Sequence, residues 1–181
     1  MTSISRAAVV LALATGLLAG CASGAPSPET RNALIESATA AMQAMNRVDP
    51  GVEAMARKGH GYVVFPEVIK AGLGFGGGHG SGVVYEQGEH VGFADLTLAS
   101  VGPQIGGQTF NELIVFENKA AMDRFKAGPL EFTAGAGAMI LQNGAAANAQ
   151  FVDGITVVVQ PVTGAMAEAT IGGQQLRYAP K

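Results

Sequence analysis

The stretch "KAGLGFGGGHGSG", residues Lys70–Gly82, places glycine at every even position from 72 to 82, namely Gly72, Gly74, Gly76, Gly78, Gly80 and Gly82. Residues two apart lie on one face of a β-strand, so a strand here has one face without side chains. Each glycine costs about 0.5–1 kcal/mol of stability relative to alanine. The pattern therefore predicts a structural glycine face, which packs at very short range against a helix or second sheet, or lets the strand bend sharply to close a barrel.

The same stretch contains the pattern G-x-G-x-x-G at residues 72–77. In dinucleotide-binding proteins this pattern opens a helix whose N-terminus holds the phosphates. Here it is followed by Val83-Val84-Tyr85 and a hairpin turn, without a helical period. We therefore interpret the glycines as strand residues and expect no cofactor. Close packing of the glycine face is favoured, and the alternative is a groove floored by bare backbone and open to a lipid chain or peptide.

The first residues, "MTSISRAAVVLALATGLLAGCASG", have the pattern of an export signal. One basic residue, Arg6, precedes an apolar run from Ala7 to Ala19, which is too short to span a bilayer and fits a signal-peptide core. The run ends in Leu18-Ala19-Gly20-Cys21, which resembles the lipobox of bacterial lipoproteins. Cys21 is the only cysteine in the chain.

The lipobox resemblance implies lipidation of the Cys21 sulfur, cleavage after Gly20 and acylation of the new amino group. Residues 1–20 are then a lipoprotein signal peptide and residues 21–27 a lipidated tether. The two or more acyl chains at Cys21 would anchor the protein stably to a membrane. No aspartate follows Cys21, which resembles outer-membrane sorting. We expect a lipid-anchored protein that faces the periplasm of a Gram-negative bacterium. The alternative is an ordinary secretory signal with an incidental cysteine.

The composition is that of one folded domain. Of the 181 residues, 48% are hydrophobic and 14% charged, which argues against disorder. The formal net charge of −3 excludes the basic footprint of a nucleic-acid-binding protein. We expect a single domain over residues 28–181.

Helical spacing of apolar residues, with Ser27 as N-cap, predicts a helix over Pro28–Arg47 and a short second helix over Val52–Lys58. The pattern then changes to short strands, with one inserted helix at Lys119–Ala127 that Asn118 caps. The expected strands are Tyr62–Lys70 continuing through the glycines to Tyr85, His90–Ser100, Gln108–Glu117, Glu131–Leu141, Ile155–Val162, and a final hairpin of Ala165–Ile171 and Gln174–Tyr178 around Gly172-Gly173.

This order of elements predicts the α+β class. We expect N-terminal helices packed on a curved antiparallel sheet or small β-barrel with one short inserted helix. A turn at Glu86–Glu89 places Gly82 opposite Phe93, where an aromatic ring could cover the bare glycine.

Three segments carry a family resemblance: "GYVVFPEVIKAGLGFGGGHGSGVVY" (Gly61–Tyr85), "ASVGPQIGGQTFNELIVFENKAAMDRF" (Ala99–Phe125) and "FTAGAGAMI" (Phe132–Ile140). They resemble the SYLF domain, a lipid-binding family whose eukaryotic members bind phosphoinositides and, in yeast, actin. The match runs from about Thr39 to the C-terminus. The resemblance implies binding of anionic lipid and no catalysis.

The candidate lipid-binding residues are Arg57, Lys58 and Lys70, which flank the start of the strand where the resemblance is best. Strong attraction to anionic membranes needs a dense basic cluster. The N-terminal helical segment instead mixes its basic residues with Glu29, Glu36 and Glu53.

Catalytic and metal-binding patterns are not evident in the sequence. His60, His79 and His90 lack a second ligand at metal spacing. Ser81 lies in Gly-Ser-Gly, which is not the G-x-S-x-G motif of serine hydrolases. The carboxylates Glu112, Glu117, Asp95 and Asp153 are scattered. An enzyme is therefore the last of our hypotheses, and we expect no metal site.

The first hypothesis is a non-enzymatic envelope protein, lipid-anchored through acylated Cys21, that binds membrane lipid, anionic lipid in particular, or another amphiphile. Its expected partners are the membrane and anionic lipid head groups, without nucleic acid. The alternative is a structural or protein-interaction module of the outer membrane that has no lipid ligand beyond its own anchor.

Overall fold

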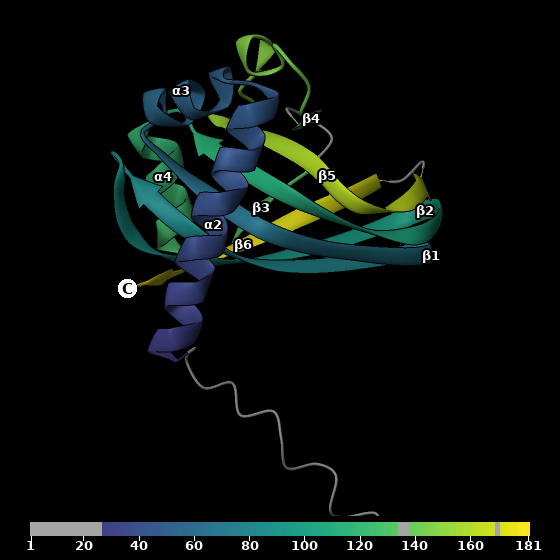
Figure 1. Cartoon of the computed structure of the whole chain (residues 1–181). Helices are drawn as coiled ribbons and strands as arrows, with labels where there is room; N and C mark the ends of the chain where they lie inside the picture. Colours follow the sequence, from purple (N-terminus) through teal and green to yellow (C-terminus); the bar gives the residue numbers. More distant parts are fainter. Residues whose placement is uncertain (1–26, 134–137, 169–170) are drawn as a thin grey trace, which may run out of the picture. The chain divides into compact units, whose positions relative to one another are not determined.

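The computed structural model describes residues 27–133, 138–168 and 171–181 (Figure 1). Its elements in chain order are α2 (Pro28–Val48), α3 (Gly51–Lys58), β1 (Gly61–Glu86), β2 (Glu89–Phe116), α4 (Lys119–Ala127), β3 (Leu130–Phe132), β4 (Ala138–Ile140), the 3-10 helix η1 (Ala146–Asn148), β5 (Ile155–Glu168) and β6 (Ile171–Pro180).

The chain forms two compact units, Met1–Arg31 and Asn32–Lys181. The described part of the first unit is the opening turn of α2, where the Thr30 amide donates to the Ser27 hydroxyl oxygen over 3.2 Å. Ser27 is therefore the N-cap, as its residue type predicts. The sheet and the rest of the described helices lie in the second unit.

The predicted α+β class is confirmed, with helices on a curled sheet. The strand order is β3-β6-β2-β5-β4, with β1 paired to β2. The expectation of a wholly antiparallel sheet is wrong at one place, since β4 pairs with β5 in parallel. The reason lies in the segment expected as one strand, Glu131–Leu141. It forms two short strands, of which β3 pairs with β6 and β4 with β5.

The centre of the sheet is the long hairpin of β1 and β2. Gln87 and Gly88 form its turn with positive φ angles of 51° and 85°, as a two-residue hairpin requires. Tyr85 pairs with His90, but Val84 pairs with Gly92, so the register shifts by one residue at Val91. The predicted pairing of Gly82 with Phe93 is therefore wrong, and Gly82 faces Ala94.

The predicted break in the second strand after Ser100 is also wrong, because β2 runs on to Phe116. Its free side is shared by two partners: residues 92–101 pair with β6 and residues 104–116 with β5. The predicted hairpin around Gly172-Gly173 is not formed. Both glycines lie within β6, opposite Ser100 and Ala99, because β5 extends to Glu168 before β6 begins.

The first half of β1 packs against the glycine face of its second half. A Cβ atom on Gly78, Gly80 or Gly82 would lie 2.6, 2.9 or 2.8 Å from the backbone oxygens of Ile69, Glu67 and Val64, respectively. Real Cβ atoms do not approach oxygen that closely. The contacts that need bare backbone are therefore made by the strand itself and not by a helix.

Gly72, Gly74 and Gly76, the other even-numbered glycines of the stretch, do not contact the first half of β1 in this way. Gly72 and Gly76 lie against the Gln104 side chain, with the missing Cβ atoms 2.9 Å from its Cδ in both cases. Gly74 has a φ of +74° and no neighbour within 4 Å of its missing Cβ. Glycine is needed at Gly74 for the backbone conformation, which forms the bend between the two halves of β1.

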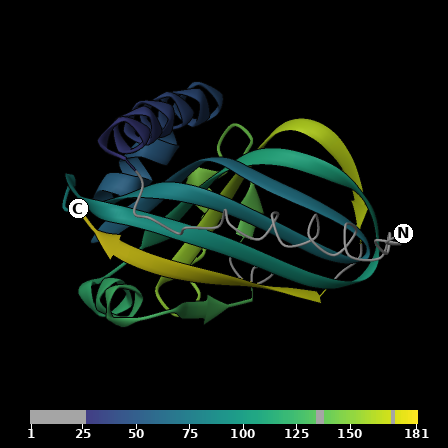
Figure 2. The same cartoon turned by 90° about the horizontal axis from the view of Figure 1, so that it is seen from below.

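Two hydrophobic clusters stabilise the sheet on its opposite faces. Helices α2 and α3 bury Ala38, Met45 and Val52 against one face. Helix α4 buries Met122 and Phe125 in the other, which is the inside of the curl. Figures 1 and 2 show the helices over one half of the sheet, whereas no described helix covers the end where β1 and β2 bend.

The glycine contact predicts a large difference between two adjacent positions. Gly78→Ala places a methyl group against the Ile69 oxygen and lowers the free energy of unfolding by about 1–3 kcal/mol. Gly77 lies on the opposite face, with its nearest atom 3.8 Å from the missing Cβ. Gly77→Ala, the matched control, changes that free energy by less than about 1 kcal/mol. Urea unfolding of both variants measures the difference, and equal losses would contradict the contact.

Candidate functional site

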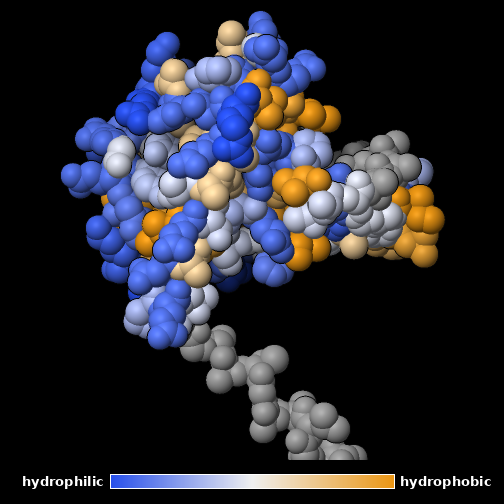
Figure 3. Space-filling view, viewed as in Figure 1, coloured by the Kyte–Doolittle hydropathy of each residue, from blue (hydrophilic) through white to orange (hydrophobic). Residues whose placement is uncertain are grey.

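An exposed apolar surface lies where β1 and β2 bend. We call it the apolar tip and define it by Ile69, Leu73 and Phe75 on β1, Val101 and Ile105 on β2, and Val162 on β5. Leu73 and Phe75 are 76% and 77% exposed, the highest values among the exposed large hydrophobic side chains. Figure 3 shows hydrophobic surface gathered at this end of the sheet.

Strand pairing brings the tip residues together. Leu73 pairs with Ile105 and Phe75 with Val101, so two apolar pairs lie next to each other across the hairpin. The register shifts between Leu73 and Phe75, where Gly74 takes its positive φ. The bend thus presents both side chains outward.

A buried amide satisfies the backbone behind the tip. Gln104 is 5% exposed, and its Nε2 donates to the oxygens of Gly74 (3.3 Å) and Ser100 (3.2 Å). Its Oε1 accepts from the Ser100 hydroxyl over 3.0 Å. Carbonyl groups freed by the irregular pairing are therefore bonded from the inside, which avoids the cost of unpaired polar groups beneath an apolar surface.

The β1 and β2 parts of the tip carry no charge beyond Lys70, whereas Glu67 precedes Ile69 by two residues and Glu168 of β5 pairs with Gln104. Residues 71–85 of β1 and 96–111 of β2 contain no Asp, Glu, Lys or Arg. Lys70 is the basic residue that adjoins the tip on β1, next to Ile69. Of the three predicted lipid-binding residues, Lys70 is therefore the nearest to the tip along the chain, although its side chain points to the opposite face of β1 from that of Ile69.

The structure does not bring Arg57 and Lys58 to Lys70. Both lie at the end of α3, before β1 begins, and Lys70 lies nine residues after Gly61 in β1. At about 3.3 Å per residue, this is about 30 Å along the strand. The Arg57 Nη2 donates to Glu53 Oε1 over 2.5 Å, so that cation is already paired.

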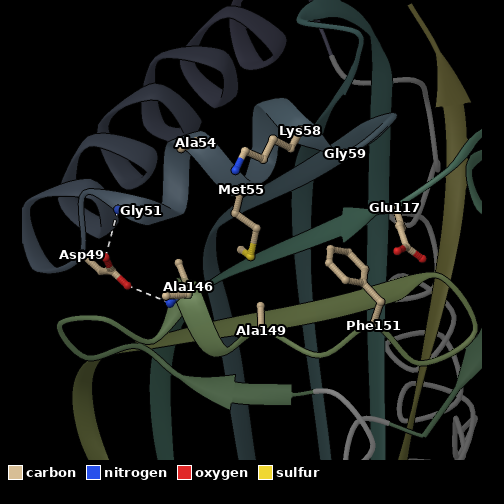
Figure 4. A pocket seen from close by; sticks show the side chains of 11 residues that line it. Asp49, Gly51, Ala54, Met55, Lys58, Gly59, Glu117, Ala146, Ala149 and Phe151 are labelled. Carbon is tan, nitrogen blue, oxygen red and sulfur yellow. Dashed lines mark hydrogen bonds between the residues drawn. The ribbon is translucent and has the colours of Figure 1, made fainter.

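Lys58 lines a cavity of about 560 Å³ below α3. Met55 and Phe151 project into it, as Figure 4 shows. The carboxylate of Asp49 accepts from the amides of Gly51 (2.9 Å) and Ala146 (2.8 Å). The bonds from Ala146 and Gly51 hold the pKa of this buried carboxyl below its usual value. Asp49 thus joins the α2–α3 corner to η1, which is a structural role.

The histidines lie apart. His60 Nε2 lies 3.2 Å from Glu86 Oε1, and Lys126 Nζ donates to Glu86 Oε2 over 2.7 Å. The bond from Lys126 lowers the pKa of Glu86. His90 contacts the Gly92 oxygen, and His79 pairs in register with Thr97. The described residues contain no group of three His, Cys, Asp or Glu side chains placed to hold a metal ion.

Glu112 is a fully buried ionisable group whose pKa is shifted far from its ordinary value. It is 0% exposed inside the curl, and Gln174 Nε2 donates to its Oε2 over 3.4 Å. Burial raises its pKa to about 8. The Oε1 atoms of Glu112 and Gln174 have no hydrogen-bond partner among the described residues. A protonated Glu112 has an O–H donor, which suits a surrounding of acceptors.

Sequence reasoning missed the tip and its support. Leu73 and Phe75 lie between glycines and Ile105 lies between Gln104 and Gly106, so none of them stands in an apolar run, although the long stretch without charge on β2 could have indicated them. Gln104 and the burial of Glu112 left no signal of their own. Cys21, the predicted lipidation site, lies outside the described residues.

Comparison with protein-family models and with curated proteins finds no match for this chain. The SYLF resemblance is therefore a hypothesis that rests on the sequence motifs. Among the described residues, none of the helices combines the length and the apolar character needed to cross a bilayer.

The burial of Glu112 predicts a pH-dependent stability. Between the ordinary pKa of 4.5 and about 8, the unfolded chain loses this proton while the folded chain keeps it. The protein therefore keeps its whole free energy of unfolding below pH 4.5. That free energy falls as the pH rises from 4.5 to about 8, by at most about 1.4 kcal/mol per pH unit.

Glu112→Gln keeps a neutral amide at this position and removes the titration. We expect the difference in unfolding free energy between wild type and Glu112→Gln to fall as pH rises from 5 to about 8 and then to level off. Chemical denaturation at each pH measures it, and the subtraction cancels other titrating groups. A difference independent of pH would show that Glu112 ionises normally in the fold.

Proposed function

We propose that this chain is a lipid-anchored, non-enzymatic envelope protein that binds membrane lipid or another amphiphile. The observation that carries the proposal is the apolar tip. Contiguous apolar surface of this kind usually marks a site of interaction with a membrane, ligand or protein. Leu73 and Phe75 keep more than three quarters of their surface exposed, although each would gain from leaving water.

Two sequence features support the membrane as the partner. The lipobox-like Leu18–Cys21 would attach the chain to the outer membrane, facing the periplasm, after removal of residues 1–20. The SYLF resemblance over most of residues 28–181 implies a lipid-binding domain. A protein held at a membrane by acyl chains meets lipid at a high local concentration, so even a weak lipid-binding surface is used.

Lys70 is the proposed contact for anionic head groups. It precedes the tip on β1 by three residues, counted to Leu73, whereas Arg57 and Lys58 lie on α3. Arg57 and Lys58 therefore contribute less to this proposal than the sequence suggested.

Co-sedimentation with vesicles tests the proposed function. Residues 21–181 carrying Cys21→Ser cannot be acylated, so any binding is that of the folded chain. We expect it to sediment with phosphatidylcholine vesicles. Absence of binding to these and to vesicles containing phosphatidylglycerol, together with capture of a specific envelope protein, would favour the alternative of a protein-interaction module.

The position of Lys70 predicts that this residue contributes more than Arg57 to binding of anionic vesicles. Lys70→Gln removes about 1 kcal/mol of attraction, and so lowers the affinity for phosphatidylglycerol-containing vesicles about fivefold while leaving neutral vesicles unaffected. Arg57→Gln is the control, because that side chain lies on α3, away from the tip. Titration of vesicles against each variant gives the affinities. A larger effect of Arg57→Gln would move the lipid contact to α3.

A further inference from the structure

We infer that the apolar tip enters the hydrocarbon layer of the bilayer, with Leu73, Phe75 and Ile105 among the acyl chains and Lys70 at the level of the head groups. This inference rests on the proposed function and deepens it. It assigns binding to insertion of apolar side chains and not to recognition of head-group charge.

The first argument is the distribution of charge. A membrane interior excludes ionised groups, and β1 and β2, two of the three strands that form the tip, carry none over residues 71–85 and 96–111, whereas Glu168 on β5 pairs with Gln104. Protein-binding surfaces usually combine an apolar centre with a polar rim. Here Lys70 adjoins the tip, and lysine beside a buried apolar segment can extend its amine to the interface.

The second argument is that backbone polar groups at the bend have hydrogen-bond partners within the protein. In hydrocarbon an unpaired carbonyl costs several kcal/mol, so an inserted segment must satisfy its backbone internally. The bend at Gly74 interrupts the regular ladder, and the buried Gln104 amide bonds the Gly74 and Ser100 oxygens at that place. Water could satisfy these oxygens on a surface that remained in solvent. An internal donor lets the surface above them leave water.

The third argument limits the depth of insertion. Strand β1 pairs with β2 alone among the described strands, so its other edge has no ladder partner. Backbone groups on that edge need water or head groups as partners, and deep insertion would remove them. The tip therefore inserts shallowly, about 5–10 Å, as amphipathic helices do at the same interface.

The absence of tryptophan makes a direct test possible. Phe75→Trp places a fluorescent reporter at the tip, and we call it the tip reporter. Phe151→Trp places the control reporter near Lys58, in the cavity below α3. Both are made in the Cys21→Ser chain, residues 21–181. Neutral vesicles with bromine on the acyl chains quench a tryptophan that enters the hydrocarbon.

We expect vesicles to shift the emission of the tip reporter to shorter wavelength and to quench it, and to leave the control reporter unchanged. High salt leaves the result with neutral vesicles unaltered. Leu73→Ser lowers partitioning into these vesicles about tenfold. Ile140→Ser, at a similarly exposed isoleucine on β4 (69%, against 76% for Leu73), is the control and changes it little.

Three outcomes would overturn the inference. Vesicle binding with the tip reporter unquenched would leave the proposed function intact and place the contact elsewhere, at α3 if the control reporter responds. Absence of vesicle binding would remove both. A blue-shifted tip reporter without lipid, with a doubled mass in sedimentation, would make the tip an interface between two copies. Thermal unfolding monitored by circular dichroism verifies that each variant folds.

Discussion

The contact between the backbone oxygens of Val64, Glu67 and Ile69 and the bare face of Gly78–Gly82 determines the shape of the sheet. A strand of 26 residues would extend far beyond any core of this size if it ran straight. It doubles back instead, and its two halves approach until backbone meets backbone. Any Cβ at the contact would push the halves apart. The stability lost at each glycine is thus the condition for closing the curl, and the core inside it compensates for that loss.

The bend that this contact requires also creates the candidate site. Doubling back forces a turn at Gly74, and the side chains on either side of it, Leu73 and Phe75, lie outside both hydrophobic clusters. Leu73 pairs with Ile105 and Phe75 with Val101 on β2, so the four side chains form one continuous apolar surface. Gln104 bonds the carbonyls that the bend frees. Fold and surface therefore have a common origin, because the residue pattern that bends the strand is the pattern that exposes the tip.

Local features were predictable from the sequence, and contacts between distant segments were not. Ser27 and Asn118 cap helices because their side chains accept from amides three residues ahead, and such signals are local. The glycine period predicted a bare strand face for the same reason. The element that covers it could not be predicted, since only tertiary structure places Ile69 above Gly78. The one-residue shift at Val91 and the burial of Glu112 beside Gln174 likewise depend on partners far along the chain.

The arrangement of charge explains why apolar contact is the stronger basis for membrane binding. The chain has a formal net charge of −3, so long-range attraction to an anionic bilayer is not available to it. Several of its cations are neutralised within the fold, as Arg57 is by Glu53, Lys119 by Asp123 and Lys126 by Glu86. These pairs lie on or beside the helices, over the half of the sheet that the helices cover. The other end, where β1 and β2 bend, offers apolar area with few charges, namely Glu67 and Lys70 on β1 and Glu168 on β5. A driving force for adsorption there has to be hydrophobic, and it would persist at salt concentrations that screen ion pairs.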